Sequence, residues 1–216
     1  MASSFRHDRD GAALIEFTLV FPIVLLIVLG VVDVTLLMID WSSYNRATYA
    51  GARIAAVSNP VAMNINAAIA GTSPGDACID PSTGVSTGNC TARNAATCVA
   101  TGVTSGGTCT GGYSFSDAAL NNIVTEMKKS FSNLDRRQVS VTYTPIMMGY
   151  VGRPDGFPMN VTVSIRCVQH QFYFLQSLMG WTMPSPPAAC NGIAVPTGVV
   201  MPAFATTLPS EDLQTN

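Results

Sequence analysis

Residues 17–32 read FTLVFPIVLLIVLGVV and contain no charged side chain. The apolar character continues to Asp40, with Asp33 as the one interruption. About 20 apolar residues are needed for a helix to cross the hydrocarbon core of a bilayer. Pro22 removes one backbone donor, which membrane helices tolerate where neighbouring groups satisfy the freed carbonyl. The stretch therefore predicts a single transmembrane helix close to the N-terminus.

A cleaved secretory signal is the alternative, because Arg6 and Arg9 precede the run as they would in a signal's basic region. However, the run is longer than the apolar region of most signals, and no A-x-A-like cleavage site closes it. We therefore expect the helix to be retained in the mature protein.

The rest of the 216-residue chain has room for one domain of ordinary size. Only 11% of the residues are charged and the net charge is −2, so we expect no nucleic-acid partner. The longest basic cluster, Lys128 and Lys129 with Arg136 and Arg137, is split by a predicted helix end. We interpret it as a solvated surface.

Six cysteines follow the apolar run: Cys78, Cys90, Cys98, Cys109, Cys167 and Cys190. None has the spacing of a zinc site or of a C-x-x-C redox motif, and we expect no metal and no cofactor. An even number of cysteines beyond a membrane span favours disulfides, with unpaired buried thiols as the alternative. Sequence proximity alone suggests Cys78–Cys90, Cys98–Cys109 and Cys167–Cys190, one of 15 connectivities.

Charge alone does not decide the orientation, because Arg6 and Arg9 before the span balance Arg46 and Arg53 after it. The cysteines need the oxidising side of the membrane. We therefore expect a single-pass protein of the inner (cytoplasmic) membrane, with its N-terminus in the cytoplasm and most of the chain in the periplasm.

Glu16 stands at the start of the apolar run, between Ile15 and Phe17. An ionised carboxylate costs roughly 2.5–3.5 kcal/mol at the centre of a bilayer and less near the interface. One interpretation is that Glu16 lies at headgroup depth and ends the span. The other is that Glu16 has a partner that appears only when the protein assembles.

The segment Gly11-Ala12-Ala13-Leu14-Ile15-Glu16-Phe17 resembles the processing site of type IV pilins and pseudopilins, in its form closest to TadE/TadF/TadG-type pseudopilins of the tight-adherence (Flp) pilus system. The small- and arginine-rich stretch 44–56 resembles the end of the TadE-like helix. Two features depart from the pattern: acidic Asp8 and Asp10 in the leader, and the cysteine-rich middle of the chain.

The resemblance implies that a prepilin peptidase cuts between Gly11 and Ala12 and removes residues 1–11 as a leader. The new amine of Ala12 would lie one helical turn from Glu16, and in a bundle Glu16 could pair with the amine of a neighbouring subunit. Such a pair would neutralise a buried charge only in the correct register.

A minor pseudopilin that helps to assemble a Tad/Flp-type pilus for adhesion, biofilm formation or secretion is therefore the leading hypothesis. Its partners would be other pilus subunits, the assembly machinery, the peptidase and the bilayer, and it would stay in the membrane or enter the pilus. The alternatives are a membrane-tethered binding module without processing and, less well supported, a secreted enzyme with an uncleaved anchor.

We expect residues 12–59 to form the transmembrane helix and a helical stem, because Asn59-Pro60 disfavours a continued helix. Trp41, Tyr44 and Tyr49 could form an interfacial aromatic belt. The small residues from Ala47 to Ala56 would let another backbone approach closely, either from a second subunit or from the chain's own outer domain.

Residues 60–216 are expected to form the outer domain. Its Gly/Ser/Thr-rich part, 71–115, shows no periodicity and is interpreted as loops held by disulfides, or as disorder if the thiols are free. Ser116 is a candidate N-cap, and apolar residues follow it at helical spacing. An antiparallel pair of strands is predicted from the alternation in residues 138–144 and 160–167, with a turn signal between them at 153–156. We also expect a short helix at 171–179 and an edge strand at 201–213. The predicted class is α+β, with a helix packed on an antiparallel sheet.

Catalytic signatures are lacking: there is no G-x-S-x-G, no H-E-x-x-H and no phosphate-binding glycine loop. His7 lies in the expected leader, and His170 has no carboxylate or cysteine at ligand spacing, so we interpret it as structural. We therefore expect no enzymatic activity.

Overall fold

The structure is a computed structural model of the whole chain. It describes residues 9–65, 76–77, 80–85, 95–146, 159–174, 190, 193 and 199–210, with side chains from Leu14 onward except at 199–200. The expected turn at 153–156 and the cysteines Cys78 and Cys90 lie outside these residues.

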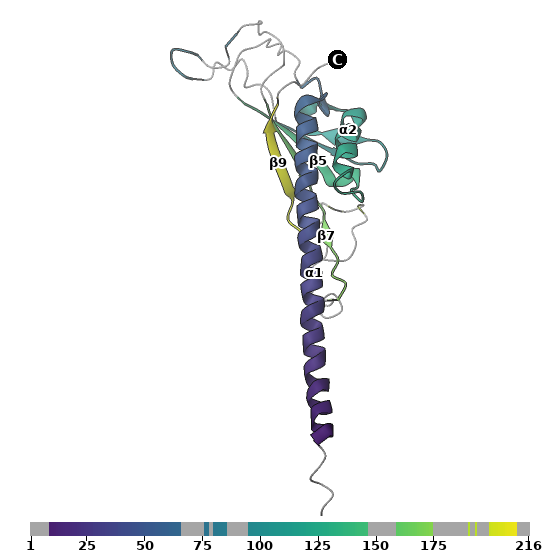
Figure 1. Cartoon of the computed structure of the whole chain (residues 1–216). Helices are drawn as coiled ribbons and strands as arrows, with labels where there is room; N and C mark the ends of the chain where they lie inside the picture. Colours follow the sequence, from purple (N-terminus) through teal and green to yellow (C-terminus); the bar gives the residue numbers. More distant parts are fainter. Residues whose placement is uncertain are drawn as a thin grey trace, which may run out of the picture.

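A single helix, α1 (Arg9–Val57), has 49 residues and includes Pro22. At 1.5 Å per residue it is about 74 Å long. Figure 1 shows it as the long axis of the molecule, with the other elements gathered around the half that ends at Val57. The predicted long N-terminal helix is confirmed, and it ends two residues before Asn59-Pro60.

The outer domain is built on a five-stranded sheet in the order β3-β2-β5-β6-β9, with every neighbouring pair antiparallel. The strands are β2 (Ala96–Ala100), β3 (Gly107–Cys109), β5 (Val139–Pro145), β6 (Met159–Ile165) and β9 (Phe204–Pro209). The antiparallel pair β5–β6 and the edge strand β9 are confirmed. Residues 171–174 form no helix, contrary to the expectation for 171–179, and 175–179 lie outside the described residues.

The remaining elements are short. They are β1 (Ala62–Met63), β4 (Ser114–Phe115), β7 (Gln169–His170), β8 (Val199–Val200) and the 3-10 turns η1 (Thr110–Gly112) and η2 (Arg136–Gln138). Strand β1 pairs with β4, and β7 pairs with β8, both antiparallel.

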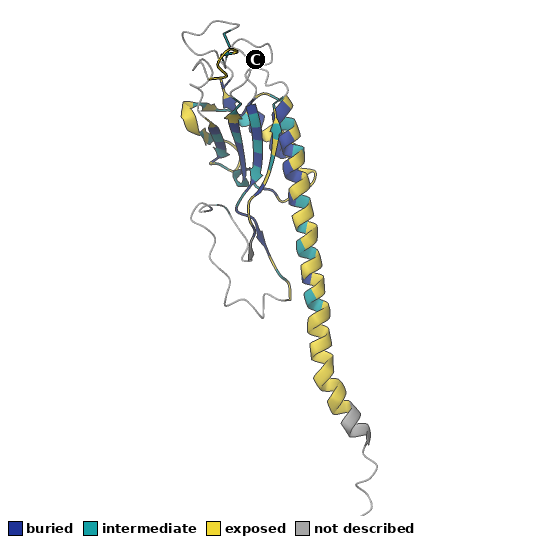
Figure 2. Ribbon diagram, turned by 90° about the vertical axis from the view of Figure 1, so that its left-hand side faces the viewer, coloured by how far each residue is buried: buried dark blue, intermediate teal, exposed yellow. Residues whose placement is uncertain are grey.

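Two helices pack on one face of the sheet. They are the upper half of α1, from Asp33 to Val57, and α2 (Asp117–Lys128). The side chain of Ser116 caps α2 by accepting a hydrogen bond from the Ala119 N–H, as the sequence predicted. Alternate residues of β5 and β6 face the helices and are fully buried. They are Val139, Val141, Tyr143, Val161, Val163 and Ile165. This is the helix packed on an antiparallel sheet that the alternation predicted (Figure 2).

The other face of the sheet is polar. Hydroxyl groups pair across adjacent strands, with Thr97 and Thr142 at 3.1 Å and Thr162 and Thr207 at 2.8 Å between oxygens. Ser140 and Ser164 pair in the same way at 2.9 Å. Because these hydroxyl groups are hydrogen-bonded to one another, this face of the sheet needs no further layer of structure to cover it.

Part of the 71–115 prediction is wrong, because β2, β3 and β4 lie in the segment expected to be loops. The inward residues of β2 are Ala96, Cys98 and Ala100, which are buried but small. Their alternation with Thr97 and Val99 is therefore weak in hydropathy, which explains why periodicity did not indicate a strand.

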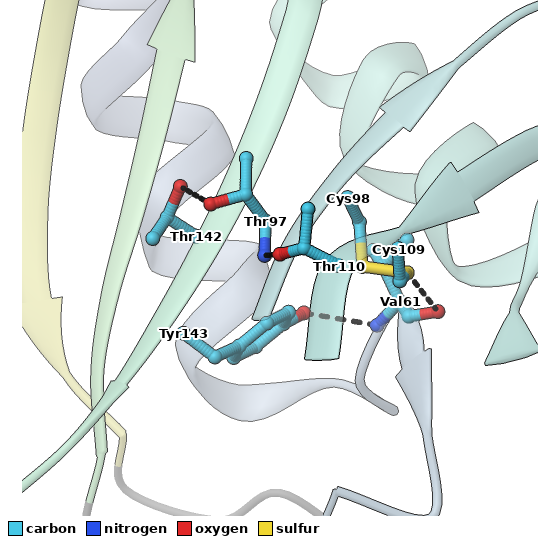
Figure 3. Close-up of a disulfide and its surroundings, with 7 residues drawn as sticks. All are labelled: Val61, Thr97, Cys98, Cys109, Thr110, Thr142 and Tyr143. Atoms are coloured by element: carbon cyan, nitrogen blue, oxygen red, sulfur yellow. Dashed lines mark hydrogen bonds between the residues drawn. A yellow bond between two sulfur atoms is a disulfide. The ribbon is translucent and has the colours of Figure 1, made fainter. Parts of the chain in front are cut away.

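A disulfide joins β2 to β3 through Cys98 and Cys109, which are directly opposite in the ladder (Figure 3). Beside it, the buried Tyr143 hydroxyl accepts a hydrogen bond from the Val61 N–H at 2.9 Å. The segment that leaves α1 is thus tied to the centre of the sheet.

The basic cluster is not wholly solvated, contrary to expectation. Arg136 is buried and donates to the carboxylate of Asp117, the first residue of α2. The Asp117 carboxylate also accepts from the Gly106 N–H, and the hydrogen bond from Arg136 lowers the pKa of Asp117 below its usual value.

Candidate functional site: the helix and its junction with the outer domain

The lower half of α1 presents apolar side chains to its surroundings. From Leu14 to Val32 the large apolar residues other than Leu29 are exposed, as the yellow lower half of the helix shows (Figure 2). In water such a surface would drive association, so it fits a lipid or protein environment. By length and composition this is the one described helix suited to crossing a membrane.

The residues of the expected processing motif lie near the beginning of α1. Gly11 and Ala12 are within the helix, although their side chains are outside the described set. Glu16 is exposed and forms no ion pair with any residue that the structure describes. Phe17 is exposed and stacks on Phe21 with 5.3 Å between ring centroids.

The upper half of α1 is part of the domain core. Small residues on its sheet-facing side are buried: Ala47, Gly51, Ala52, Ala55 and Ala56. A Cβ atom on Gly51 would lie 2.7 Å from Met127 Sδ and 3.2 Å from Val163 Cγ1. Of the two interpretations of this small-residue stretch, close packing on the chain's own domain is therefore the one observed.

The expected aromatic belt on α1 is wrong for Tyr44. The Tyr44 side chain is buried between Phe131 and Phe204, with ring-centroid distances of 4.7 and 5.1 Å. Trp41 is partly exposed and meets Phe204 edge-to-face at 4.7 Å. These aromatic contacts hold β9 and Phe131, which lies just after α2, to the helix.

Two carboxylates mark the junction between the halves of α1. Asp33 is fully buried although its neighbours Val32 and Val34 are exposed. Its two oxygens accept hydrogen bonds from the backbone N–H groups of Tyr173 (3.1 Å) and Phe174 (2.9 Å). A segment 140 residues further along the chain therefore covers this carboxylate.

Asp40 lies seven residues after Asp33, which places it on the same face two turns further on. Its Oδ2 is 2.7 Å from Nδ1 of the buried His170. His170 therefore has a carboxylate partner, contrary to the expectation from the sequence. That expectation rested only on residues close to His170 in the sequence, whereas Asp40 is 130 residues away.

The segment that reaches these carboxylates is the descending segment, residues 168–174. It leaves the sheet at Cys167, passes through β7, and runs down beside α1 below the sheet (Figure 1). At the point where the segment leaves the sheet, a disulfide joins Cys167 to Cys190. Strand β8 pairs with β7. Both described disulfides match two of the three pairs suggested by sequence proximity.

Sequence reasoning missed this junction. The available signal was the pair Asp33 and Asp40, two carboxylates on one face of a helix that is otherwise apolar there. Their partners could not be read from the sequence, because two of the donors are backbone N–H groups of a segment without periodicity.

Features of a catalytic or metal centre are sparse in the described residues. No group of three His, Cys, Asp or Glu side chains is placed to hold a metal ion there. Two described cavities of about 440 and 450 Å³ have mixed linings. One lies beside the end of α1 with Arg53 and Glu126, and the other beside α2 with Lys128 and Asp135.

The fold and the junction together define a class: a small α+β outer domain carried on one long helix whose lower half is apolar and exposed. The family model described as "TadE-like protein" matches residues 11–53, which cover most of α1. The chain thus carries a TadE-like segment, consistent with a TadE-like protein of the Tad/Flp pilus system. Neither a curated protein nor a solved structure matches the chain.

Proposed function

We propose that this protein is a minor pseudopilin-like, membrane-anchored subunit in the assembly of a Tad/Flp-type pilus. The observation that carries the proposal is the TadE-like match over residues 11–53, because that segment contains both the exposed apolar surface of α1 and Glu16. The role is structural assembly and involves no catalysis by this chain.

In this proposal a prepilin peptidase cuts between Gly11 and Ala12, and the rest of α1 stays in the inner membrane. The N-terminus lies in the cytoplasm and the outer domain in the periplasm, which is the oxidising side that disulfides Cys98–Cys109 and Cys167–Cys190 require. Other pilus subunits and the assembly machinery are the partners.

Glu16 is the residue that separates assembly from simple anchoring. A tether gains nothing from an exposed carboxylate at the edge of its apolar run. In an assembly, Glu16 of one subunit pairs with the new amine of Ala12 on its neighbour. Removing one member of a fully buried ion pair costs about 3–5 kcal/mol, and less near the headgroups.

We expect Glu16→Ala to be inserted and processed normally but to abolish fibre formation, with Glu16→Asp intermediate because its side chain is shorter. The measurement compares membrane abundance and N-terminal sequence with fibre yield in the same cells. Thr18→Ala is the matched control, since Thr18 is an exposed polar residue in the same run whose hydroxyl donates to the Ile15 carbonyl of its own helix. It should leave fibre yield unchanged.

Normal fibres with Glu16→Ala would remove the assembly role of this carboxylate. An N-terminus at Met1 or Ala2 in the parent protein would favour the other candidate, a membrane-tethered binding module that is not processed.

A further inference from the structure

The last two described residues of the descending segment, Tyr173 and Phe174, lie at the level where the uncharged run of α1 ends. Tyr173 and Phe174 are bonded to Asp33, and Asp33 directly follows the uncharged residues 17–32. From Leu14 to Asp33 the helix rises about 28 Å, close to the ~30 Å thickness of a hydrocarbon core. A bilayer around the lower half of α1 would therefore have its outer boundary at Asp33.

Aromatic side chains point outward at this level. Tyr173 is 72% exposed and Phe174 is 44% exposed, although their backbone N–H groups are held against the helix. A tyrosine with an apolar ring and a polar hydroxyl is the residue type that concentrates at the headgroup boundary. Large aromatic residues fixed in water beside an apolar helix would otherwise carry an unfavourable exposed surface.

The carboxylate chemistry fits the same position. An aspartate at the end of an apolar run is costly if it faces lipid without partners. Asp33 is fully buried by the descending segment, and two backbone N–H groups satisfy its oxygens. The segment thus shields the charge from lipid and, in the same arrangement, places Tyr173 and Phe174 beside the boundary.

The hold on this segment does not depend on Asp33 alone. His170 Nδ1 is 2.7 Å from Asp40 two turns above, and the Cys167–Cys190 disulfide closes the base. The contacts with Asp33 and Asp40 therefore set the height of the segment relative to α1, and the disulfide fixes the position where the segment leaves the sheet.

We propose that the descending segment is a second membrane contact: Tyr173 and Phe174 enter the headgroup region of the outer leaflet of the same bilayer that α1 crosses. The proposal rests on the membrane anchoring of the proposed function. It adds a lipid-binding surface contributed by the outer domain, and it assigns Asp33 and Asp40 the role of holding that surface at the boundary.

The test uses the full chain in vesicles of phosphatidylcholine and phosphatidylglycerol, with tryptophan fluorescence quenched by phospholipids doxyl-labelled near the headgroup or deep in the acyl chain. Trp41→Phe and Trp181→Phe give a background without tryptophan. Tyr173→Trp then reports the proposed contact. Val28→Trp reports the span, and Tyr49→Trp reports an exposed site about 24 Å further along α1 than Asp33.

We expect the shallow label to remove at least half of the Tyr173→Trp emission and the deep label clearly less. Val28→Trp should show the opposite preference, and Tyr49→Trp should lose less than a tenth with either label. Adding Asp33→Leu to Tyr173→Trp should reduce shallow quenching at least twofold, because the two oxygens that accept from the Tyr173 and Phe174 N–H groups are lost while the Asp40–His170 contact holds only the upper part of the segment.

The outcomes separate the two claims. Quenching of Val28→Trp with none of Tyr173→Trp would overturn the second contact while leaving the anchor intact. An unquenched Val28→Trp would overturn the anchor and the contact together. Quenching that Asp33→Leu does not reduce would overturn the role assigned to Asp33. If Tyr173→Trp emission were not quenched by either lipid label and changed only when pilus partners were added, the surface would bind a protein and the lipid contact would be refuted.

Discussion

The two halves of α1 are one continuous helix, but different surroundings determine their side chains. From Leu14 to Val32 most apolar residues are large and exposed, whereas from Ala47 to Ala56 the residues buried against α2 and the sheet are mainly alanine and glycine. The lower half provides surface for an external apolar environment. The upper half packs closely on the outer domain, since alanine and glycine let the helix backbone approach it. Helical sequence alone therefore says little about function until the size of the side chains on each face is considered.

The largest expected effect comes from placing the same carboxylate in each half. Ala52→Glu would bury a charge at a fully enclosed position, so we expect the outer domain to lose more than about 4 kcal/mol of stability or to fail to fold. Leu25→Glu should leave the domain stable in detergent and impair insertion by roughly 2.5–3.5 kcal/mol.

Denaturant unfolding in detergent measures the first effect, and the fraction of protein recovered in membranes measures the second. If both variants destabilised the domain equally, the division of α1 at Asp33 would be wrong.

A smaller effect is expected at the closest approach between α1 and the domain. Gly51→Ala gains about 1 kcal/mol of helix propensity. However, the new Cβ would lie within 3.2 Å of Met127 and Val163 atoms, and over-packing of this kind costs about 1–3 kcal/mol. We expect a net loss of up to about 2 kcal/mol in the free energy of unfolding.

Met127→Ala supplies the matched test, because it removes the side chain that Gly51→Ala would strike. The double variant should be less destabilised than the sum of the two single variants. Strict additivity would show that the contact with Met127 does not limit the size of residue 51.

The smallest effect is the pH dependence of the outer domain, which the exposed half of α1 should not share. Hydrogen bonds from Arg136 and Arg137 lower the pKa values of Asp117 and Asp135 in the folded state. A lowered native pKa stabilises the fold at pH values above the unfolded pKa of about 4, and this stabilisation is lost as the pH falls through the native pKa.

Urea unfolding of the detergent-solubilised chain should therefore give constant stability from pH 7 to about 5 and a decline below about 4. Asp117→Asn should lower stability at pH 7 and make the decline shallower. An unchanged acid profile in this variant would mean that the Asp117–Arg136 pair does not contribute to it.

Local pattern predicted much of this fold. The uncharged run predicted the long helix, and the Ser116 cap with the apolar spacing after it predicted α2. The central strands were predicted from the alternation in residues 138–144 and 160–167. Strand β2 was missed because Ala96, Cys98 and Ala100 are too small to produce a clear hydropathy alternation. Here the evidence for a strand is tertiary: a buried position between β3 and β5.

The candidate site divides in the same way. Gly11, Ala12, Glu16 and Phe17 were predicted from a short motif, and their roles in processing and assembly stay predictions. Asp33 and Asp40 were not predicted as a site, because their partners come from residues 170–174, more than 100 positions away. Long-range pairing of this kind leaves no periodic trace in a single sequence.

The unbroken course of α1 has a mechanical consequence. The apolar lower half and the upper half that packs on the sheet belong to one helix, so no loop separates them. From Asp33 to Val57 it forms a lever of about 36 Å, and a tilt of about 20° would swing its far end sideways by roughly 12 Å. A rotation or displacement of the lower half would therefore be transmitted along the helix to the sheet, as torque or thrust.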